Sequence, residues 1–344
     1  MKSKAMARSV FMIILACSIL CIEARCQDER DLVEYLKAGQ ADASKLIGAY
    51  MGPAIEGLSY GMNGGWYHTA KAHKSLGFDL GISLNAVFIP TSKNTFDANA
   101  LDLQVAQIAT ADGRAPTIVG PKDTPVYNID VDGDGTPDGS FDGPEGLDFK
   151  KEFKVSGVIA PTAQLGIGIY KNTDLKFRYM PEVESGKTKI KLIGFGVMHD
   201  IKQHIPGIKL MPFDLSILAA FTKVDGSSGL DGAFGNAGDP RPQKIDYTMN
   251  AWLIQALISK KFSVITLYGG IGYNTINTKT SITGSYEVTE ISTTLVDPFN
   301  ETFKNSSIRV TAGFRLKLGP IYLNSDYSLQ EYSTLSVGLG VSVR

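Results

Sequence analysis

The sequence carries almost no cysteine. Its three cysteines, Cys17, Cys21 and Cys26, all lie within the first 26 of 344 residues. The chain beyond residue 26 therefore has no thiol for a disulfide, a cysteine-based zinc site or a cysteine nucleophile. It also lacks the run of roughly 18 apolar residues that a membrane helix needs. If this part of the chain crosses a membrane, it must do so as a closed β-barrel, because only helices and closed barrels satisfy their backbone groups in lipid.

The first 26 residues have the three zones of a signal peptide. Three cations precede an apolar run at residues 10–20, and small residues at 24 and 26 fit a cut between Cys26 and Gln27. An uncleaved anchor would need a longer apolar run, and a lipoprotein cut before Cys17 would leave most of the run behind it. We expect residues 1–26 to be removed without lipid attachment, and the chain to be exported.

Charge gives no sign of a polyanionic partner. Without residues 1–26 the chain has 30 basic and 34 acidic residues, a net charge near −4. This balance predicts no nucleic-acid partner.

Residues 27–76 are expected to form an N-terminal helical segment and plug. Apolar residues recur at three- and four-residue spacing over 28–52, which predicts an amphipathic helix, and Pro53 is expected to end or kink it. Residues 57–67 are too rich in glycine for a helix interior and predict irregular chain in a protected space. Either the helix packs on the rest of the protein, or the segment plugs a barrel. The residues expected in such a plug are Tyr60, Asn63, Trp66 and Tyr67.

From Phe78 the apolar period changes to two, as in a strand with one wet face and one apolar face. Similar runs occur at 163–170, 175–180, 188–198, 213–223, 246–259, 262–276, 308–318, 321–329 and 334–343. The run 308–318 places Arg309, Arg315 and Lys317 on the face opposite its apolar side chains. These three cations are expected to face a wide, polar, water-filled lumen.

The repeated strands predict an all-β, antiparallel transmembrane β-barrel over residues 77–344. A count of strand-like runs gives about 12 strands, within a range of 10 to 14, and bacterial single-chain barrels prefer even strand numbers. Long glycine- and aspartate-rich segments at 108–152 and 225–244 predict external loops. The alternative is a secreted soluble β protein, and the terminal Arg344 departs from the usual aromatic end of membrane barrels.

The segment 130–138 (DVDGDGTPD) resembles the first part of a calcium loop. Carboxylates stand at relative positions 1, 3, 5 and 9, with glycine at 6 and a backbone carbonyl available at 7. The usual glutamate at position 12 is replaced by Phe141, and the simpler interpretation is a solvated acidic turn. We expect a structural calcium ion. The candidate ligands are Asp130, Asp132, Asp134, Thr136 and Asp138.

The histidines offer only a weak case for catalysis. His68 and His73 lie beside the expected plug, and His199 and His204 follow a strand. Ser59, His199 and Asp200 could form a triad of a membrane lipid hydrolase, but no local signature supports it. We therefore expect no enzyme.

Three segments carry a resemblance to a known family. They are residues 50–90, residues 193–206 (IGFGVMHDIKQHIP) and residues 213–223 (FDLSILAAFTK). Together they resemble an uncharacterised, domain-of-unknown-function family of outer-membrane β-barrel proteins, over almost all of the chain after the leader. The resemblance implies an N-terminal helical piece followed by a barrel and supplies no activity. The plan is also similar to that of the fatty-acid transport porins, although no motif specific to them is present.

Three functions remain open at this stage. The first is a porin-like passive channel in the outer membrane for a small, possibly amphipathic solute. The second is a non-transporting surface scaffold or binding barrel stabilised by calcium, and the third is the lipid hydrolase. The lipid bilayer is the expected partner, and the sequence does not define the solute or the oligomeric state.

Overall fold

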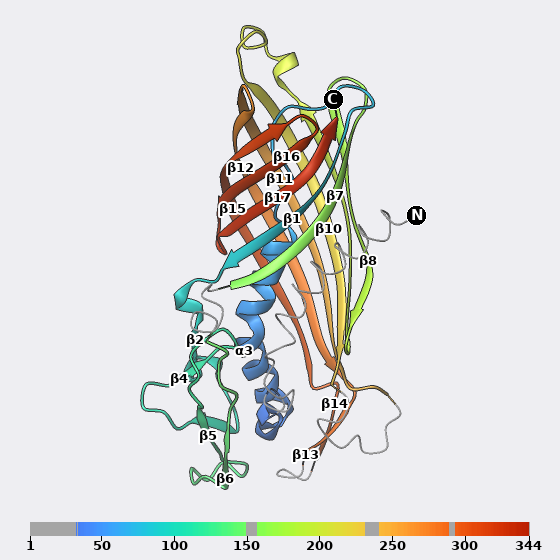
Figure 1. Cartoon of the computed structure of the whole chain (residues 1–344). Coiled ribbons are helices and arrows are strands. Elements are labelled where there is room, and N and C mark those ends of the chain that lie inside the picture. Colours follow the sequence, from blue (N-terminus) through green and yellow to red (C-terminus); the bar gives the residue numbers. More distant parts are fainter. Residues whose placement is uncertain (1–31, 33, 149–156, 231–240, 289–292, 344) are drawn as a thin grey trace.

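The computed structural model describes residue 32 and residues 34–148, 157–230, 241–288 and 293–343. Ten strands close into an antiparallel barrel in the order β1-β17-β16-β15-β12-β11-β10-β9-β8-β7 (Figure 1). The first strand, β1, closes it by pairing with β17 on one side and β7 on the other. The barrel strands are β1 (Phe78–Phe88), β7 (Gly157–Gly168), β8 (Thr173–Ser185), β9 (Thr188–Asp200), β10 (Asp214–Gly229), β11 (Lys244–Phe262), β12 (Ile265–Thr283), β15 (Phe299–Leu318), β16 (Ile321–Leu329) and β17 (Thr334–Val343).

The expected antiparallel barrel is confirmed, and its ten strands lie at the lower end of the expected range of 10 to 14, below the central value of about 12. The remaining strands form small separate sheets in the connections. These are β2 (Thr95–Asp97) with β4 (Arg114–Pro116); β3 (Ala106–Ile108) with β5 (Val126–Ile129) and β6 (Gly139–Asp142); and β13 (Ser285–Val288) with β14 (Thr293–Val296).

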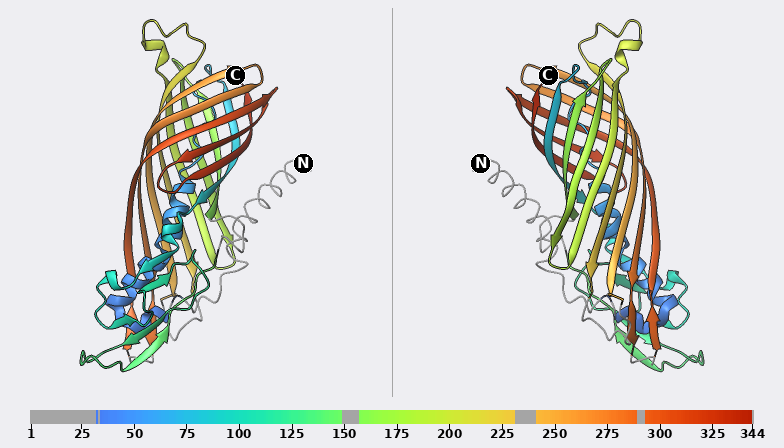
Figure 2. Two further views of the ribbon diagram at one scale, coloured as in Figure 1. Left: turned by 90° about the vertical axis from the view of Figure 1, so that its left-hand side faces the viewer. Right: turned by 90° about the vertical axis from the view of Figure 1, so that its right-hand side faces the viewer.

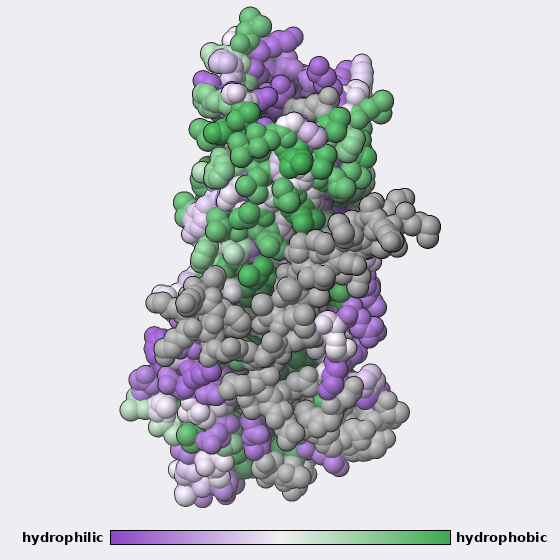
Figure 3. Space-filling view, viewed as in Figure 1, coloured by the Kyte–Doolittle hydropathy of each residue, from purple (hydrophilic) through white to green (hydrophobic). Residues whose placement is uncertain are grey.

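Alternation along each strand separates an apolar outer wall from a polar inner one. On β15, Ile308 and Val310 are 65% and 42% exposed, whereas Arg309 between them is 1% exposed. On the face shown in Figure 3, outward apolar side chains gather in an apolar band over the upper part of the barrel, and hydrophilic side chains predominate above and below it. Because the inner wall is polar, apolar side chains form a buried core inside the barrel only where other parts of the chain fill the lumen.

The two ends of the barrel differ. The C-terminal end carries the start of β1, the end of β17, the turns 169–172, 263–264 and 319–320, and the loop 201–213 with η4 (Lys202–His204) (Figure 1). The long-loop end carries the described parts of the long connections, residues 89–148, 230, 241–243, 284–288 and 293–298, including η2 (Thr91–Lys93) and η3 (Asn99–Leu101), and the short turns 186–187 and 330–333. Such asymmetry is typical of membrane barrels, which have short periplasmic turns and longer outer loops.

The N-terminal segment begins at the long-loop end with η1 (Glu34–Ala38) and α3 (Gly39–Met62) (Figure 2). The prediction of a helix that ends or kinks at Pro53, with irregular chain from 57, is wrong in its boundary, because α3 continues through Pro53 to Met62. The glycines serve close packing: a methyl group added at Gly61 would lie 2.8 Å from the side chains of Val87 and Ala160. Within the described residues no helix is long and apolar enough to cross a membrane.

Three buried apolar clusters lie along the N-terminal segment, in order from the long-loop end towards the C-terminal end. The first lies at the long-loop end, where the beginning of the N-terminal segment packs against β5, β6 and the β13–β14 hairpin. Burial there raises the pKa of Tyr127 to about 12, so that its hydroxyl stays neutral at physiological pH. The second surrounds the last turns of α3, and the third surrounds Trp66. The inside of the barrel is thus filled by the chain itself.

Candidate functional site

After α3, residues 63–73 run through the inside of the barrel towards its C-terminal end; we call them the plug segment. Trp66 lies against β9, Tyr67 against β12, Ala70 against β10 and β11, and His73 against β8. Contacts with strands on all sides place the segment inside the wall, as Figure 2 shows for the helix that leads into it. The segment leaves at the C-terminal end, where the chain turns back into β1.

Two arginines hold the end of α3. Arg178 of β8 donates from Nη1 to the carbonyl of Met62 (3.2 Å) and from Nη2 to that of Gly64 (2.6 Å). Arg309 of β15 donates from Nη1 to the carbonyl of Asn63 (3.2 Å). Carbonyls at a helix C-terminus have no partner within the helix and carry the negative end of its dipole, so cations are favourable there. The two guanidinium groups, both 1% exposed, therefore cap the helix in the middle of the barrel.

Trp66 fits against the wall next to the same arginine. The guanidinium carbon of Arg178 lies 3.8 Å from the centre of the indole ring, which is a cation–π contact. Two glycines of β9 make room for the ring, because a methyl group at Gly194 or Gly196 would lie 3.2 Å or 3.0 Å from it. The indole Nε1 donates to Asn63 Oδ1 (3.3 Å). Trp66 of the plug segment is therefore closely packed against β9 of the wall.

The four expected plug residues all lie inside the barrel, each no more than 4% exposed. Tyr60, on α3, stacks on Tyr332 with ring centres 5.2 Å apart and donates to Glu331 Oε2 (2.9 Å). Tyr67 meets Tyr268 edge to face at 5.7 Å. Asn63 is fully buried and accepts from Thr222 at 3.2 Å as well as from the indole.

Near the C-terminal end, histidines of the segment meet aspartates of the wall. His73 lies 2.8 Å from Asp174 through Nδ1, and its backbone N–H donates to the same carboxylate at 2.8 Å. Asp79 of β1 lies 3.4 Å from His68 Nε2 and 3.5 Å from His73 Nε2. Lys176 interacts electrostatically with both carboxylates.

This group of alternating imidazoles and carboxylates is almost entirely buried. Ligand atoms of His73, Asp79 and Asp174 lie within 4.8 Å of one another, close enough to share a metal ion. However, the two ring nitrogens of His73 already face different carboxylates. The arrangement fits a latch that holds the segment to β1 and β8.

The three expected lumen cations point inward, but the water-filled space expected around them is filled at this level. Arg309 contacts the plug segment, and Arg315 lies 4.6 Å from the centre of the Tyr322 ring and is 3% exposed. Lys317 Nζ donates to the carbonyl of Ser342 (2.8 Å). The sequence pattern gave the direction of these side chains, but it could not show that the chain's own N-terminus would occupy the space.

The residues of the hydrolase hypothesis are not brought together. Ser59 on α3 hydrogen-bonds with Ile55 O, Tyr247 and Thr278. His199 bonds with Thr173 (2.8 Å) and His204 (3.0 Å) at the C-terminal end. The serine and the histidine therefore have different partners and share no hydrogen bond.

The acidic loop 130–138 joins β5 and β6 at the tip of the long-loop end (Figure 1). Carboxylate oxygens of Asp130, Asp132 and Asp138 lie within 4.8 Å of one another. Asp130 also accepts backbone N–H groups of Gly133 (2.8 Å) and Gly135 (2.9 Å), so part of its charge is satisfied within the loop. Asp134 accepts the N–H of Thr136 and lies outside the group of three.

Sequence reasoning missed the residues that hold the plug. Arg178 and Asp79 lie in runs that the period-2 pattern found, and Asp174 directly precedes the run 175–180, but none of the three was singled out. The available signal was a charged residue on the inner face of an otherwise apolar strand, as in Asp174, Lys176 and Arg178 at alternate positions. Their partners could not be read from the sequence, because His73 and Asp174 are 101 residues apart.

Comparison with known proteins places the chain in a family. The family described as "Family of unknown function (DUF6588)" matches residues 1–343, which confirms the resemblance to an uncharacterised family. No curated protein matches. Among solved structures, the chain is similar to the transport unit of the autotransporter AIDA-I from Escherichia coli, with 9% identity and a TM-score of 0.33 over 85% of this chain and 98% of that one.

Two further barrels give similar values. The translocator domain of the autotransporter NalP from Neisseria meningitidis has 10% identity and a TM-score of 0.30, covering 86% of this chain and 94% of that one. Ail, the attachment invasion locus protein of Yersinia pestis, has 8% identity and a TM-score of 0.26, covering 78% and 98%. At these scores the likeness supports no argument about function.

Proposed function

We propose that this chain, which belongs to the DUF6588 family of unknown function, is an outer-membrane β-barrel that passes a small solute when its plug segment moves. The observation that carries the proposal is the way the segment is held. Its backbone is bound by side chains of the wall, through Arg178, Arg309, Ser216 and Ser259. Such bonds can exchange with water when the segment leaves.

The outer wall supports the membrane location. The ten strands close into a barrel, and the apolar band over its upper part matches the surface that lipid requires (Figure 3). With short turns on the periplasmic side, the C-terminal end faces the periplasm and the long-loop end faces outward. The expected signal peptide lies outside the described residues, and export remains part of the proposal.

Movement is assigned to the plug segment and not to α3. The last turns of α3 lie in an apolar cluster with residues of β1, β7, β9 and β11, and displacing them would expose this surface to water. The plug segment also packs in an apolar cluster, around Trp66, but its backbone is in addition held by polar side chains of the wall. Its departure would uncover a wall that carries charges of both signs, including Arg178, Arg315 and Asp174. This lining suits a small polar or amphipathic solute. The proposal includes no catalytic step.

A reversible lock tests the proposal. The hydroxyls of Thr69, in the plug segment, and Ser259, on β11, lie 3.3 Å apart. Because the chain has no cysteine after residue 26, the double variant Thr69→Cys/Ser259→Cys introduces one defined pair of thiols. In liposome-swelling or planar-bilayer assays we expect flux in the reduced protein and loss of flux on oxidation, with Thr69→Cys alone insensitive. Equal flux in both states, or no flux in the unmodified protein, would refute the proposal.

A second candidate is a non-transporting surface barrel that calcium stabilises. The observation that favours it is the acidic loop at the long-loop end, where three aspartates could share one ion. The close packing of Trp66 against Gly194 and Gly196 is consistent with it as well. The oxidation test separates the two functions, since a scaffold requires no flux in either state.

A further inference from the structure

The wall of the barrel is incompletely zipped between β7 and β8. Their ladder runs from Gly168–Asp174 to Gln164–Arg178 and stops there. Both strands continue, β7 down to Gly157 and β8 to Ser185, and neither continuation has a partner across this gap among the described residues. We call the space between residues 157–163 and 179–185 the seam. Figure 1 shows β7 turning away from β8 towards the long-loop end.

Two prolines lie where the ladder stops. If the register continued, Pro161 would face Pro181, because paired residues in this ladder sum to the same value as Gln164 and Arg178. Proline has no N–H to donate, and within sheets it is confined to free edges, strand starts and bulges. A register shift between Met180 and Val183 further separates β8 from a regular ladder. The sequence therefore prevents closure of the seam.

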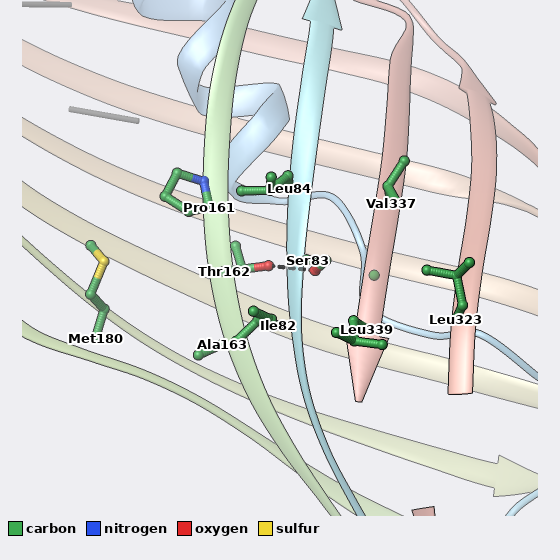
Figure 4. Close-up of a pocket in the computed structure, with 11 residues that line it drawn as sticks. Ile82, Ser83, Leu84, Pro161, Thr162, Ala163, Met180, Leu323, Val337 and Leu339 are labelled. Carbon is green, nitrogen blue, oxygen red and sulfur yellow. Dashed lines mark hydrogen bonds between the residues drawn. The ribbon is translucent and has the colours of Figure 1, made fainter. Parts of the chain in front are cut away.

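The seam lies beside an apolar groove in the outer wall. This cavity of about 160 Å³ is lined mainly by apolar side chains of β1, β7, β16 and β17, together with the hydroxyl side chains Ser83 and Thr162 and with Met180 from the far side of the seam (Figure 4). Its outer rim includes Leu84, Val337 and Leu339, each at least 40% exposed. On the β7 side, the residues of the seam pair with Ile82–Phe88 of β1, so this edge lies within the apolar band.

Behind the seam lies the apolar cluster around α3. Met180 faces inward, is 4% exposed, and belongs to the same cluster as Tyr60 and Met62. Below it, the β8 edge becomes polar with Glu182 and Glu184, and Glu184 lies 3.4 Å from Lys189. The free edges thus reach water at the long-loop end, where their backbone groups can be hydrated. From lipid to water the seam offers an apolar groove, an apolar interior and a charged rim.

We propose that the seam is a lateral binding site for an amphiphile with a single apolar chain. The chain lies in the groove and reaches between β7 and β8 to Met180, and the polar head stays at the charged rim. A surface this apolar favours a hydrocarbon chain, since each buried methylene contributes about 0.8 kcal/mol. A phospholipid with two chains would fit the seam less well than a single chain. This inference deepens the proposed function. Only the passage of the amphiphile between lumen and membrane rests on that function.

The test places a bimane fluorophore on each of two cysteine variants, Met180→Cys and Ile276→Cys. The second is a matched control, because Ile276 is buried in the same apolar cluster as Met180 but lies on β12, four strands away from β8 in the barrel, with regular ladders on both sides. Full-length folded protein, checked by heat-modifiable gel mobility, is placed in phosphatidylcholine vesicles and titrated with doxyl-labelled stearate. We expect saturable quenching at position 180, reversed by unlabelled stearate, and several-fold weaker quenching at position 276.

Equal quenching at both positions, or quenching that rises linearly and resists competition, would show only general partition into the bilayer and overturn the proposal. Disulfide-linked dimers of Met180→Cys with loss of quenching would assign the seam to a second copy of the chain, and would also overturn it. The double variant Pro161→Thr/Pro181→Thr, which restores both N–H groups, should reduce the quenching. Quenching needs no transport, so the two proposals can fail separately. Absence of quenching in a protein that shows flux refutes only this binding site. Absence of flux in a protein that shows quenching refutes only the channel.

Discussion

Replacing Arg178 by methionine is expected to release the plug segment. Methionine keeps an unbranched side chain in the wall but removes the guanidinium that bonds the carbonyls of Met62 and Gly64 and covers the ring of Trp66. In the docked state the two carbonyls would then be buried without these donors. In the released state they are hydrated whichever residue occupies position 178, so the substitution acts on the docked state.

The size of the effect follows from these contacts. An unsatisfied buried acceptor costs about 1–3 kcal/mol, so two cost about 2–6 kcal/mol. The lost cation–π contact adds to this loss, while methionine avoids the cost of burying a charge. A net change of about 2 kcal/mol is a conservative figure, and it raises the released population about thirtyfold.

Single-channel recording in planar bilayers measures this population as the frequency of open events. We expect Arg178→Met to open about thirtyfold more often than the unmodified protein, and Arg178→Lys to lie between them, since lysine keeps a charge but not the planar fork. Lys223→Met is the matched control: it removes a cation from β10 at a position that is 43% exposed and pairs with Asp225. It should not change opening.

Two results would refute this reasoning. If Arg178→Met folds, by heat-modifiable mobility, but opens no more often than Lys223→Met, the guanidinium does not hold the segment. If Lys223→Met opens equally often, the effect is one of net charge and not of the helix cap.

Three further outcomes are expected. His73→Phe leaves the buried Asp174 without its ring partner, which should reduce the free energy of unfolding by about 3–5 kcal/mol and lower the temperature of heat-modifiable unfolding. Adding Asp174→Asn to this variant should recover part of the loss. Independent, additive effects of the two substitutions would contradict the pairing. Chelation of calcium should speed proteolysis within residues 130–138. Asp130→Asn should abolish this effect of chelation, whereas Asp112→Asn should keep it. A cleavage rate that does not depend on calcium would show that the loop binds no calcium. Gly61→Leu should force α3 off the wall and lower the folded yield in detergent, at a cost of about 1–3 kcal/mol or more, and an unchanged yield would contradict the tight contact.

The strands could be predicted because their physics is local. A membrane wall with one wet and one apolar face imposes period 2, so every barrel strand left its mark, from β1 to β17. The ten runs that the pattern named correspond to the ten barrel strands, so the central value of about 12 was too high. The structure instead places the extra strands in small sheets at the long-loop end.

The sequence analysis predicted which segment forms the plug, but it did not predict the contacts that hold this segment to the wall. Glycine content at 57–67 indicated irregular chain, but α3 continues to Met62 because the neighbouring wall, at Val87 and Ala160, leaves no space for a side chain at Gly61. Helix propensity is a weak prior against such tertiary packing. The seam was likewise hidden, since Pro161 and Pro181 acquire their meaning only once β7 and β8 are neighbours.

The path of the N-terminal segment limits the order in which the molecule can assemble. The segment runs directly into β1, and β1 is the strand that pairs with both β7 and β17. Leu80 and Val341, which face each other in the last of these ladders, are separated by most of the chain, and such distant contacts form late. A barrel that closes first would have to be threaded afterwards by η1 and α3, whereas one that closes around them needs no threading. Assembly therefore favours a helix already in place, with the wall built round it and β1 and β17 joined last.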